Sequence, residues 1–392
     1  MSSHLTAAAA ARRLGVTRAT LYAYVSRGLV RSRAFAGKRE RQYLAEDVER
    51  LLKRASGRRD PARVASQALG VEGLPVLSSG LTLIESGRVY YRGKDVLELA
   101  ASQRFEAVAG WLWGGACALE GSLYLPSAKE RELFAGLHFA RAAQCYLARA
   151  EAQDPGAYLA SPEAVRRTGA RIVFGLAALA SAARDTPEGV ASALCRAWGL
   201  SARTARRAIE EALILCADHE LNVSAFTARA IASAGATPYM AVSGALAALT
   251  GHRHGGLTAR VAALLDETGE PAQLMVERLR LGESVPGFGH PLYPEGDPRA
   301  RRLLALCPKN AIRARCLAFE QAAERVLGER PVLDFGLVAL ARSLALPASA
   351  PFVLFALGRS AGWVAHCIEQ YALAQLIRPR AEYTGPRPEP SA

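Results

Sequence analysis

From about residue 65 onward, the chain consists mainly of long segments rich in Ala and Leu, separated by Gly and Pro. The clearest of these segments are 164–184, 187–198 and 202–216. Ala and Leu are strong helix formers, whereas Gly and Pro end helices, so a succession of α-helices is predicted. Strand signals are few, and the best is 81–91 (LTLIESGRVYY), where two short apolar runs flank a turn as in a hairpin. The body is therefore predicted to be mainly α.

The length of 392 residues exceeds one ordinary core and predicts two or three folding units. Hydrophobic residues make up 51% of the chain and charged residues 22%, which is typical of globular proteins. The seven cysteines are scattered without a C-x-x-C pair or a zinc-like cluster, which predicts reduced core residues and no metal site. No basic start leads into an apolar run, and the apolar stretch 337–358 is interrupted by Arg342, Pro347 and Pro351. We therefore expect a cytoplasmic protein that does not enter a membrane.

The net charge of +13 is concentrated at the N-terminus. Residues 1–60 hold fourteen Lys or Arg and five Asp or Glu, so nine of the thirteen net charges fall there. Residues 4–13 predict an Ala-rich helix, a turn containing Gly15 follows, and residues 18–27 predict a second helix. This order is typical of a helix-turn-helix module.

The second predicted helix has two faces. Its spacing places Leu21, Tyr24 and Val25 toward a core. Its outward face carries the residues that would enter the major groove of DNA: Arg18, Thr20 and Tyr22. After it, the basic stretch RSRAFAGKRERQY predicts a short hairpin or wing along a phosphate backbone, and 46–54 predicts a third helix.

Residues 1–56 together resemble the small helix-turn-helix modules of the excisionase and mercury-regulator type. A basic appendage that aids solubility or subunit assembly is the alternative to a DNA-binding module. Residues 57–64 are polar, contain Pro61 and form the predicted linker to the body.

Three segments of the body place histidines in unusual local sequence: ADHELN with His219, GHRHGG with His252 and His254, and GFGHPLY with His290. Glycines beside a histidine let a backbone or a ligand approach closely. A neighbouring carboxylate can hold a histidine in one tautomer. Each of these histidines alone would more often be structural, so their meaning depends on the segments taken together.

The order and wording of the segments resemble the citrate synthase family over roughly residues 77–392. The resemblance begins with YRGKD, continues through ADHELNVSAFTAR, HGG and GFGHPLYPEGDPRA, and ends with LDF, FALGRSAG, WVAHCIEQ and IRPRAEYTG. Residues 120–186 match poorly. The family implies a two-domain helical body with the active site in the cleft, the large domain from 65–255 and 349–392 and the small domain from 256–348. Closure of the cleft would shield the reaction from water, with Gly255-Gly256 as the expected hinge.

The reaction that the resemblance implies condenses acetyl-CoA or propionyl-CoA with oxaloacetate, giving citrate or 2-methylcitrate and coenzyme A. Such a condensation needs a base for a carbon acid, a partner for the enol oxygen and an acid for the new alkoxide. The resemblance assigns these roles to Asp334, His254 and His290 in that order. Asp334 lies in the apolar run PVLDF, which would leave its carboxylate partly desolvated, and a helix N-cap is its alternative role.

The resemblance also implies substrate-binding residues. Bidentate guanidinium contacts suit the two carboxylates of oxaloacetate. Four residues correspond to the family's oxaloacetate ligands: His219, Arg299, Arg359 and Arg378. Arg378 would reach into the site of a second subunit, which predicts at least a homodimer. For coenzyme A, the backbone of three residues would cradle the adenine: Val285, Gly287 and Gly289. Acyl-CoA is a co-substrate and no permanently bound cofactor is implied, whereas His252 and His366 are expected to pack in the core.

The chain departs from the family where Pro294-Glu295 replace a usual Lys or Arg that would meet coenzyme A phosphates. Val332 and Leu333, just before the expected base, differ as well. These departures and the helix-turn-helix leave a second class of function open, a transcription regulator whose body senses acyl-CoA or a carboxylate without turnover. Retention of Asp334 disfavours this alternative, because a sensor would need the arginines but not the base.

Overall fold

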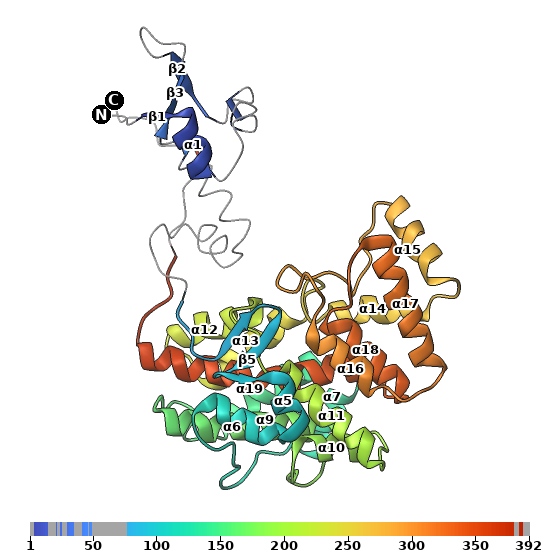
Figure 1. The fold of residues 1–392 in the computed structure, drawn as a ribbon. Helices are drawn as coiled ribbons and strands as arrows, with labels where there is room; N and C mark the ends of the chain where they lie inside the picture. Colours follow the sequence, from blue (N-terminus) through green and yellow to red (C-terminus); the bar gives the residue numbers. More distant parts are fainter. Residues whose placement is uncertain are drawn as a thin grey trace. The chain divides into compact units, whose positions relative to one another are not determined.

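The computed structural model describes residues 4–14, 21, 24–25, 30–34, 41–45, 47–48, 77–379 and 384–386. The chain divides into two compact units, residues 1–78 with 378–392 and residues 79–377. Each unit has its own hydrophobic core. The described residues are mainly helical, which confirms the predicted fold class (Figure 1).

The first unit contains a three-stranded antiparallel sheet and a helix. The strands are β1 (His4–Thr6), β2 (Ser32–Ala34) and β3 (Arg41–Leu44), with β3 in the middle, and α1 spans Ala7–Leu14. Strands β2 and β3 form the predicted wing. The prediction of a helix from residue 4 is wrong, because the first three of these residues pair with β3. Thr6 Oγ1 then accepts a hydrogen bond from Ala9 N–H at the start of α1.

A small core stabilises the first unit. Its buried residues are Ala10, Ala11, Leu21, Val30, Tyr43 and Val48, and Tyr24 and Val25 pack against them as predicted. Asp47 accepts hydrogen bonds from Arg31 N (2.9 Å), Nε (2.8 Å) and Nη2 (3.0 Å), which joins the start of the wing to the segment predicted as the third helix. The linker 57–64 and the predicted DNA contacts Arg18, Thr20 and Tyr22 lie outside the described residues.

The second unit begins with the predicted hairpin. Strand β4 (Thr82–Glu85) pairs with β5 (Arg88–Tyr91), which pairs with β6 (Lys94–Asp95). The turn between β4 and β5 uses positive φ at Ser86 (52°) and Gly87 (72°), which Gly adopts without strain. Asp95 then caps α5, since its Oδ1 accepts from Leu97 N at 2.8 Å.

Helices form the rest of the second unit. In chain order they are α5 (Val96–Ser102), α6 (Phe105–Trp113), α7 (Ala128–Ala135), α8 (Phe139–Ala152), α9 (Pro162–Ala180), α10 (Val190–Ala197), α11 (Arg203–Cys216), α12 (Val223–Ser233), α13 (Pro238–Leu249), α14 (Leu257–Asp266), α15 (Pro271–Arg280), α16 (Pro298–Leu306), α17 (Ala311–Leu327), α18 (Leu333–Ser343) and α19 (Ala350–Leu373). The three clearest helix predictions correspond to α9, α10 and α11. Helix α9 starts at a proline after the N-cap Ser161, as helix rules favour, and ends before Ala182, whose φ is 49°.

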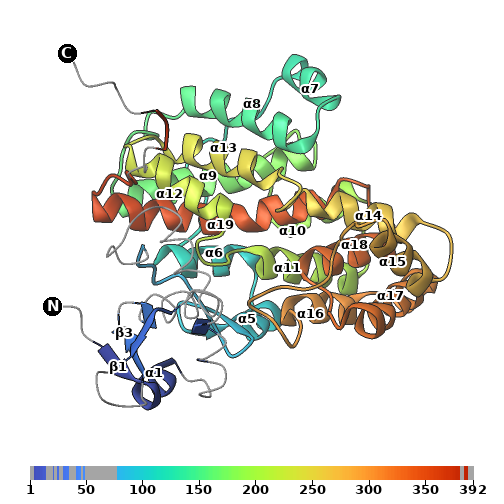
Figure 2. The same cartoon turned by 90° about the horizontal axis from the view of Figure 1, so that it is seen from above.

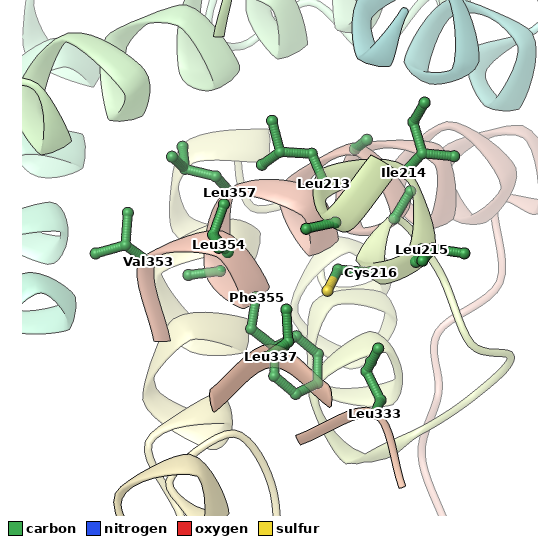
Figure 3. Close-up of a cluster of buried hydrophobic side chains, with 14 of the residues drawn as sticks. Leu213, Ile214, Leu215, Cys216, Leu333, Leu337, Val353, Leu354, Phe355 and Leu357 are labelled. Carbon is green, nitrogen blue, oxygen red and sulfur yellow. The ribbon is translucent and has the colours of Figure 1, made fainter. Parts of the chain in front are cut away.

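Helix α19 is the central helix of this unit. It contacts α6, α9, α11, α12, α13 and α18, and Figure 2 shows it crossing the middle of the unit. Figure 3 shows part of the core around it, in which Leu213 of α11, Leu337 of α18 and Leu354 of α19 are labelled. The helix has 24 residues and is apolar enough to cross a membrane, but its most apolar window is 100% buried inside the protein. It is therefore the core helix of this unit.

Helices α14 to α18 gather at one end of the second unit (Figure 1). Helix α15 packs on α17, and α14, α16 and α17 pack on α18. Two helices connect this group to the others, since α16 also contacts α5 and α11, and α18 contacts α19. These helices occupy the predicted small domain, whose boundaries at 256 and 348 stay a prediction.

Candidate active site

Six of the residues predicted to act in catalysis or to bind oxaloacetate lie in the second unit, on segments that are far apart in the sequence. His219 lies between α11 and α12, His254 between α13 and α14, His290 in the loop after α15, Arg299 in the first turn of α16, Asp334 in the first turn of α18 and Arg359 in the middle of α19. Burial, followed by the charges of Arg299, Arg359, His290 and His254, lowers the pKa of His219 well below its usual value. Arg299 and Arg359 also act on the pKa of Asp334, so the charges of these two arginines connect His219 and Asp334 to one site.

His219 and His290 lie side by side, with ring centroids 5.5 Å apart and ring planes at 89°. Tyr293 Oη lies 2.6 Å from His219 Nε2. Leu292 N–H donates to His290 Nδ1 at 3.2 Å, so the proton of the neutral imidazole is on Nε2. Burial and then Arg299 lower the pKa of His290. His290 is thus a neutral imidazole whose Nε2–H can donate to a ligand.

Arg299 is held by Asp297 at the start of the same helix. Its Nε and Nη2 donate to the two carboxylate oxygens at 3.0 and 2.8 Å. Its buried Nη1 has no hydrogen-bond partner among the described residues. Asp297 Oδ2 also accepts from Leu333 N at 3.2 Å, which ties the start of α16 to the start of α18. Because a buried, charged donor without a partner is costly, Nη1 is suited to an anionic ligand.

Arg359 repeats this arrangement from α19. Its Nε donates to Cys216 O at 2.7 Å, and its guanidinium carbon lies 5.0 Å from the centroid of the Phe355 ring. Its Nη1 is also buried, and no acceptor for it occurs in the described part of the chain. Two fixed guanidinium groups, each with an unused buried nitrogen, can bind a substrate that carries two carboxylates.

His254 contacts Ser224 and lies edge-on to Phe355. Its Nε2 is 2.8 Å from Ser224 Oγ, which also accepts from Trp363 Nε1 at 3.1 Å. Burial, and then Arg359, lower the pKa of His254 to about 3. His254 is therefore neutral at physiological pH. Ser224 Oγ donates its own proton to Asn222 Oδ1 at 2.8 Å, so it accepts from His254 Nε2–H, and the neutral imidazole carries no proton on Nδ1 in this arrangement.

Asp334 is a partly buried carboxylate in the first turn of α18. Its Oδ1 is buried and has no hydrogen-bond partner within the described ranges. Burial raises the pKa of Asp334 to about 7, against the opposing effects of its backbone hydrogen bond and Arg299. The N-cap of α18 is Val332, so the N-cap role is excluded for Asp334. The arrangement leaves a desolvated carboxylate with a free oxygen, as a base for a carbon acid requires.

The segment predicted to meet coenzyme A packs beside the chain that leads into α18. Val332 N–H donates to Gly287 O and Gly289 N–H donates to Arg330 O, both at 3.0 Å. Gly289 has a φ of 76°, and a Cβ there would lie 2.5 Å from the Glu329 carboxyl carbon, so a side chain would be both strained and crowded. Val285, two residues before Gly287, is buried. These contacts explain the glycines structurally, and the role of Val285, Gly287 and Gly289 in coenzyme A binding stays a prediction.

Other predicted residues have mixed outcomes. Arg378 is exposed and belongs to the first unit, so its role also stays a prediction.

His366 is fully buried, as expected, and its Nε2 lies 3.2 Å from Asp218 Oδ1. The expectation of core packing is wrong for His252, which is exposed. Five cysteines are buried and Cys117 is partly buried, but Cys145 is exposed at the surface. Among the described residues, no group of three or more His, Cys, Asp or Glu could hold a metal ion.

Four groups that organise the site were not predicted from the sequence: Tyr293 Oη, Asp297, Ser224 Oγ and the Cys216 carbonyl oxygen. Each holds one of the predicted residues: Asp297 holds Arg299 locally at the start of α16, and the other three make contacts between segments far apart in the sequence. Tyr293 and Asp297 lie within the GFGHPLYPEGDPRA segment, so their location gave a signal but their partners did not. A carbonyl oxygen gives no sequence signal at all.

Comparisons with known proteins match each of the two parts of the chain to a family. Residues 70–380 match the family model described as the C-terminal domain of citrate synthase, and residues 5–53 match that of the MerR helix-turn-helix family of regulatory proteins. The latter match confirms a MerR-type module and leaves the excisionase likeness unsupported. The chain is similar to the citrate synthase of Haloferax volcanii, with 30% identity over 360 residues, 81% of this chain and 95% of that protein.

Other relatives match over less of their length. Citrate synthase 2 of Bacillus subtilis is 37% identical over 189 residues, covering 46% of this chain and 51% of that protein, so the chain spans about half the length of this relative and of several others. The crystal structure of citrate synthase from Thermotoga maritima superposes with a TM-score of 0.67 at 26% identity, over 82% of this chain and 97% of that one.

Proposed function

This chain belongs to the citrate synthase family, and we propose that it condenses an acyl-CoA with oxaloacetate. The observation that carries the proposal is Asp334, a desolvated carboxylate with a free oxygen and a pKa of about 7. A pKa near the working pH is the one best suited to general base catalysis. A domain that only bound the substrate would gain nothing from such a carboxylate and would lose stability by burying it.

In the proposed mechanism, Asp334 removes a proton from the carbon next to the thioester carbonyl. His254 donates a hydrogen bond to the thioester oxygen, which carries the charge that develops as the enol forms. For this, the Ser224 hydroxyl would turn from Asn222 Oδ1 to His254 Nε2, so that the imidazole proton lies on Nδ1. The enol carbon attacks the ketone of oxaloacetate, whose oxygen is polarised by His290 Nε2–H and becomes the hydroxyl of the product. Water then cleaves the thioester and releases coenzyme A. Neutral histidines suit both donor roles, because they stabilise a developing anion without a strong competing charge.

Arg299 and Arg359 would bind the two carboxylates of oxaloacetate through their unused nitrogens. The partner subunit's Arg378 would complete the site, so the active form would be at least a homodimer. Light scattering that gave a monomer at working concentration would contradict this part of the proposal. The seven cysteines are all free, which supports a reducing, cytoplasmic location.

Two acyl groups remain candidates. Acetyl-CoA and propionyl-CoA differ by one methylene, a difference worth only about 1–3 kcal/mol in a pocket. The replacement of a usual basic residue by Pro294-Glu295 removes a predicted phosphate contact, so we expect weaker binding of coenzyme A than a basic residue would give. Glu295→Lys would then lower the KM for the acyl-CoA.

A second function is supported by the MerR-type match over residues 5–53 and by the basic charge of residues 1–60. We propose that this module binds DNA, with Arg18, Thr20 and Tyr22 on the helix that enters the major groove. If the module binds DNA, the chain would act as a regulator whose body senses acyl-CoA or a carboxylate, with or without turnover. The test is binding of the full chain to DNA fragments taken from around its own gene. Binding to one of these fragments that exceeds binding to random duplex DNA would support the proposal, and equal binding to both would contradict it.

The proposed activity is tested by release of the coenzyme A thiol from acetyl-CoA and from propionyl-CoA in the presence of oxaloacetate. Turnover with either thioester that depends on oxaloacetate supports a synthase and identifies the preferred acyl group. Asp185→Asn, an exposed carboxylate in a loop, serves as the matched control for changes at Asp334. No turnover with either thioester would favour the sensor.

A further inference from the structure

A buried carboxylate joins α11 to α16 away from the residues assigned above. Glu211 is only 1% exposed, and its two oxygens accept from Arg302 of α16, from Nε at 2.6 Å and from Nη2 at 2.8 Å. Arg207, one turn earlier on α11, donates from Nε to the same carboxylate at 3.3 Å. The parallel two-bond contact between a guanidinium and a carboxylate fixes direction as well as distance.

The α11 side of this contact is itself anchored. Arg207 donates from Nη1 to Gln103 O at 3.2 Å and from Nη2 to Ala100 O, both at the C-terminal end of α5. Glu211 therefore has a fixed position between α5, α11 and α16. Arg302 is the more exposed partner, with 36% of its side chain exposed, and its acceptor among the described residues is Glu211.

Both helices lead directly to the site. Arg302 lies one turn after Arg299 on α16, and Asp297 at the start of α16 accepts from Leu333 N–H next to Asp334. On the other side, the last residue of α11 is Cys216, whose carbonyl oxygen holds Arg359. The distance between the two substrate arginines is thus set by how α16 sits on α11.

We propose that Glu211 is a positioning residue that, through Arg302, sets the spacing of Arg299 and Arg359 for a dicarboxylate substrate. This inference rests on the proposed function for the identity of that substrate. Loss of the contact leaves α16 on α11 with apolar contacts only, so Arg299 and the start of α18 shift together. Misplacement of a substrate-binding group by about 1 Å can reduce the rate by about 100-fold, so an effect of about 10- to 100-fold on kcat/KM for oxaloacetate is expected.

The test compares Glu211→Gln, Arg302→Gln and Arg302→Lys with Arg301→Gln, which changes the exposed neighbour on the same helix. We expect both Gln variants at the contact to raise the KM for oxaloacetate far more than they change kcat, Arg302→Lys to recover part of the loss, and Arg301→Gln to match the native protein. The double variant Glu211→Gln/Arg302→Gln should be no worse than either single variant. An unchanged KM for oxaloacetate in folded Glu211→Gln protein overturns the proposal.

A second readout does not need turnover. In the full-length protein, hydrogen exchange of the 298–306 and 333–337 segments should be faster in Arg302→Lys than in Arg301→Lys, and equal exchange in the two variants overturns the proposal. Arg302→Lys keeps the charge and so is the variant best able to fold. If the native protein turns over no acyl-CoA, the proposed function fails while this exchange difference still decides whether the contact positions α16 and α18.

Discussion

The two units use arginine in opposite ways. In the first unit, the Arg31 side chain is 66% exposed even while it is paired with Asp47. In the second unit, Arg299 and Arg359 are 3% and 1% exposed. Each donates from Nε to a fixed acceptor and has a buried Nη1 without a hydrogen-bond partner among the described residues. Exposed charge acts at long range and is screened by salt, whereas buried charge acts at one point and is screened little. The net charge of the chain therefore describes its first unit and says little about the site.

The largest expected effect on turnover comes from replacing the buried Arg359 of α19. Arg359→Gln removes a buried charge, together with the donor to Cys216 O, and should lower kcat/KM for oxaloacetate by about 100-fold or more. Steady-state kinetics with varied oxaloacetate measures this loss. Arg196→Gln on the surface of α10 is the control and should leave kcat/KM within about twofold. An equal kcat/KM for oxaloacetate in the two variants would mean that the buried Arg359 matters no more for turnover than the exposed Arg196.

A smaller effect is expected when the charge is kept. Arg299→Lys retains the positive charge but cannot form the two parallel bonds with Asp297. The substrate carboxylate would keep a counter-ion at this position, but that counter-ion would no longer be held in a fixed orientation. We expect the KM for oxaloacetate to rise about tenfold. A variant indistinguishable from the native protein in kinetic titrations would show that charge alone accounts for the role of Arg299.

The pH profile sharpens the contrast further, because Asp334 must be ionised to act as a base. Its pKa of about 7 predicts that kcat/KM rises about tenfold for each pH unit up to roughly pH 7 and then levels off. A profile that is flat between pH 5 and 7 would contradict this role.

The raised pKa of Asp334 also predicts that the folded protein becomes less stable as the pH rises, although turnover increases. Burial raises the folded pKa of Asp334 above its unfolded value of about 4, so its stabilising neutral form is fully present below about pH 4 and is lost as the pH rises to about 7. Asp334→Asn should therefore raise the melting temperature at pH 8 relative to the native protein and change it less at pH 5. Calorimetry at the two pH values checks this, and an equal shift at both would exclude the linkage.

The smallest effect on turnover is expected in the first unit. Arg18→Ala should leave kcat and KM unchanged, while it weakens DNA binding and reduces the dependence of that binding on salt. Turnover and DNA binding measured at several salt concentrations separate the two functions. A loss of turnover in Arg18→Ala would mean that the module acts on the body and that the units are not independent in function.

Periodicity and helix-ending residues were sufficient to predict the helical body, the hairpin at 81–91 and the inward faces of Leu21, Tyr24 and Val25. The six candidate residues for catalysis and oxaloacetate binding could be proposed from the sequence because each lies in a distinctive segment. The contacts that fix them were not predictable, since Asp297 and Tyr293 act through partners chosen by tertiary packing. The strand at His4–Thr6 was missed for the same reason, because its partner among the described residues is β3, nearly forty residues away.

The central claim is that Asp334 is the base of an acyl-CoA condensation. Its most direct test is release of the coenzyme A thiol at pH 8 with saturating oxaloacetate, comparing the native chain with Asp334→Asn, which keeps the shape of the side chain but cannot accept the proton. We predict that the native chain turns over and that the variant is slower by about 100- to 10,000-fold. A variant that retains more than about a tenth of the native rate would contradict the claim.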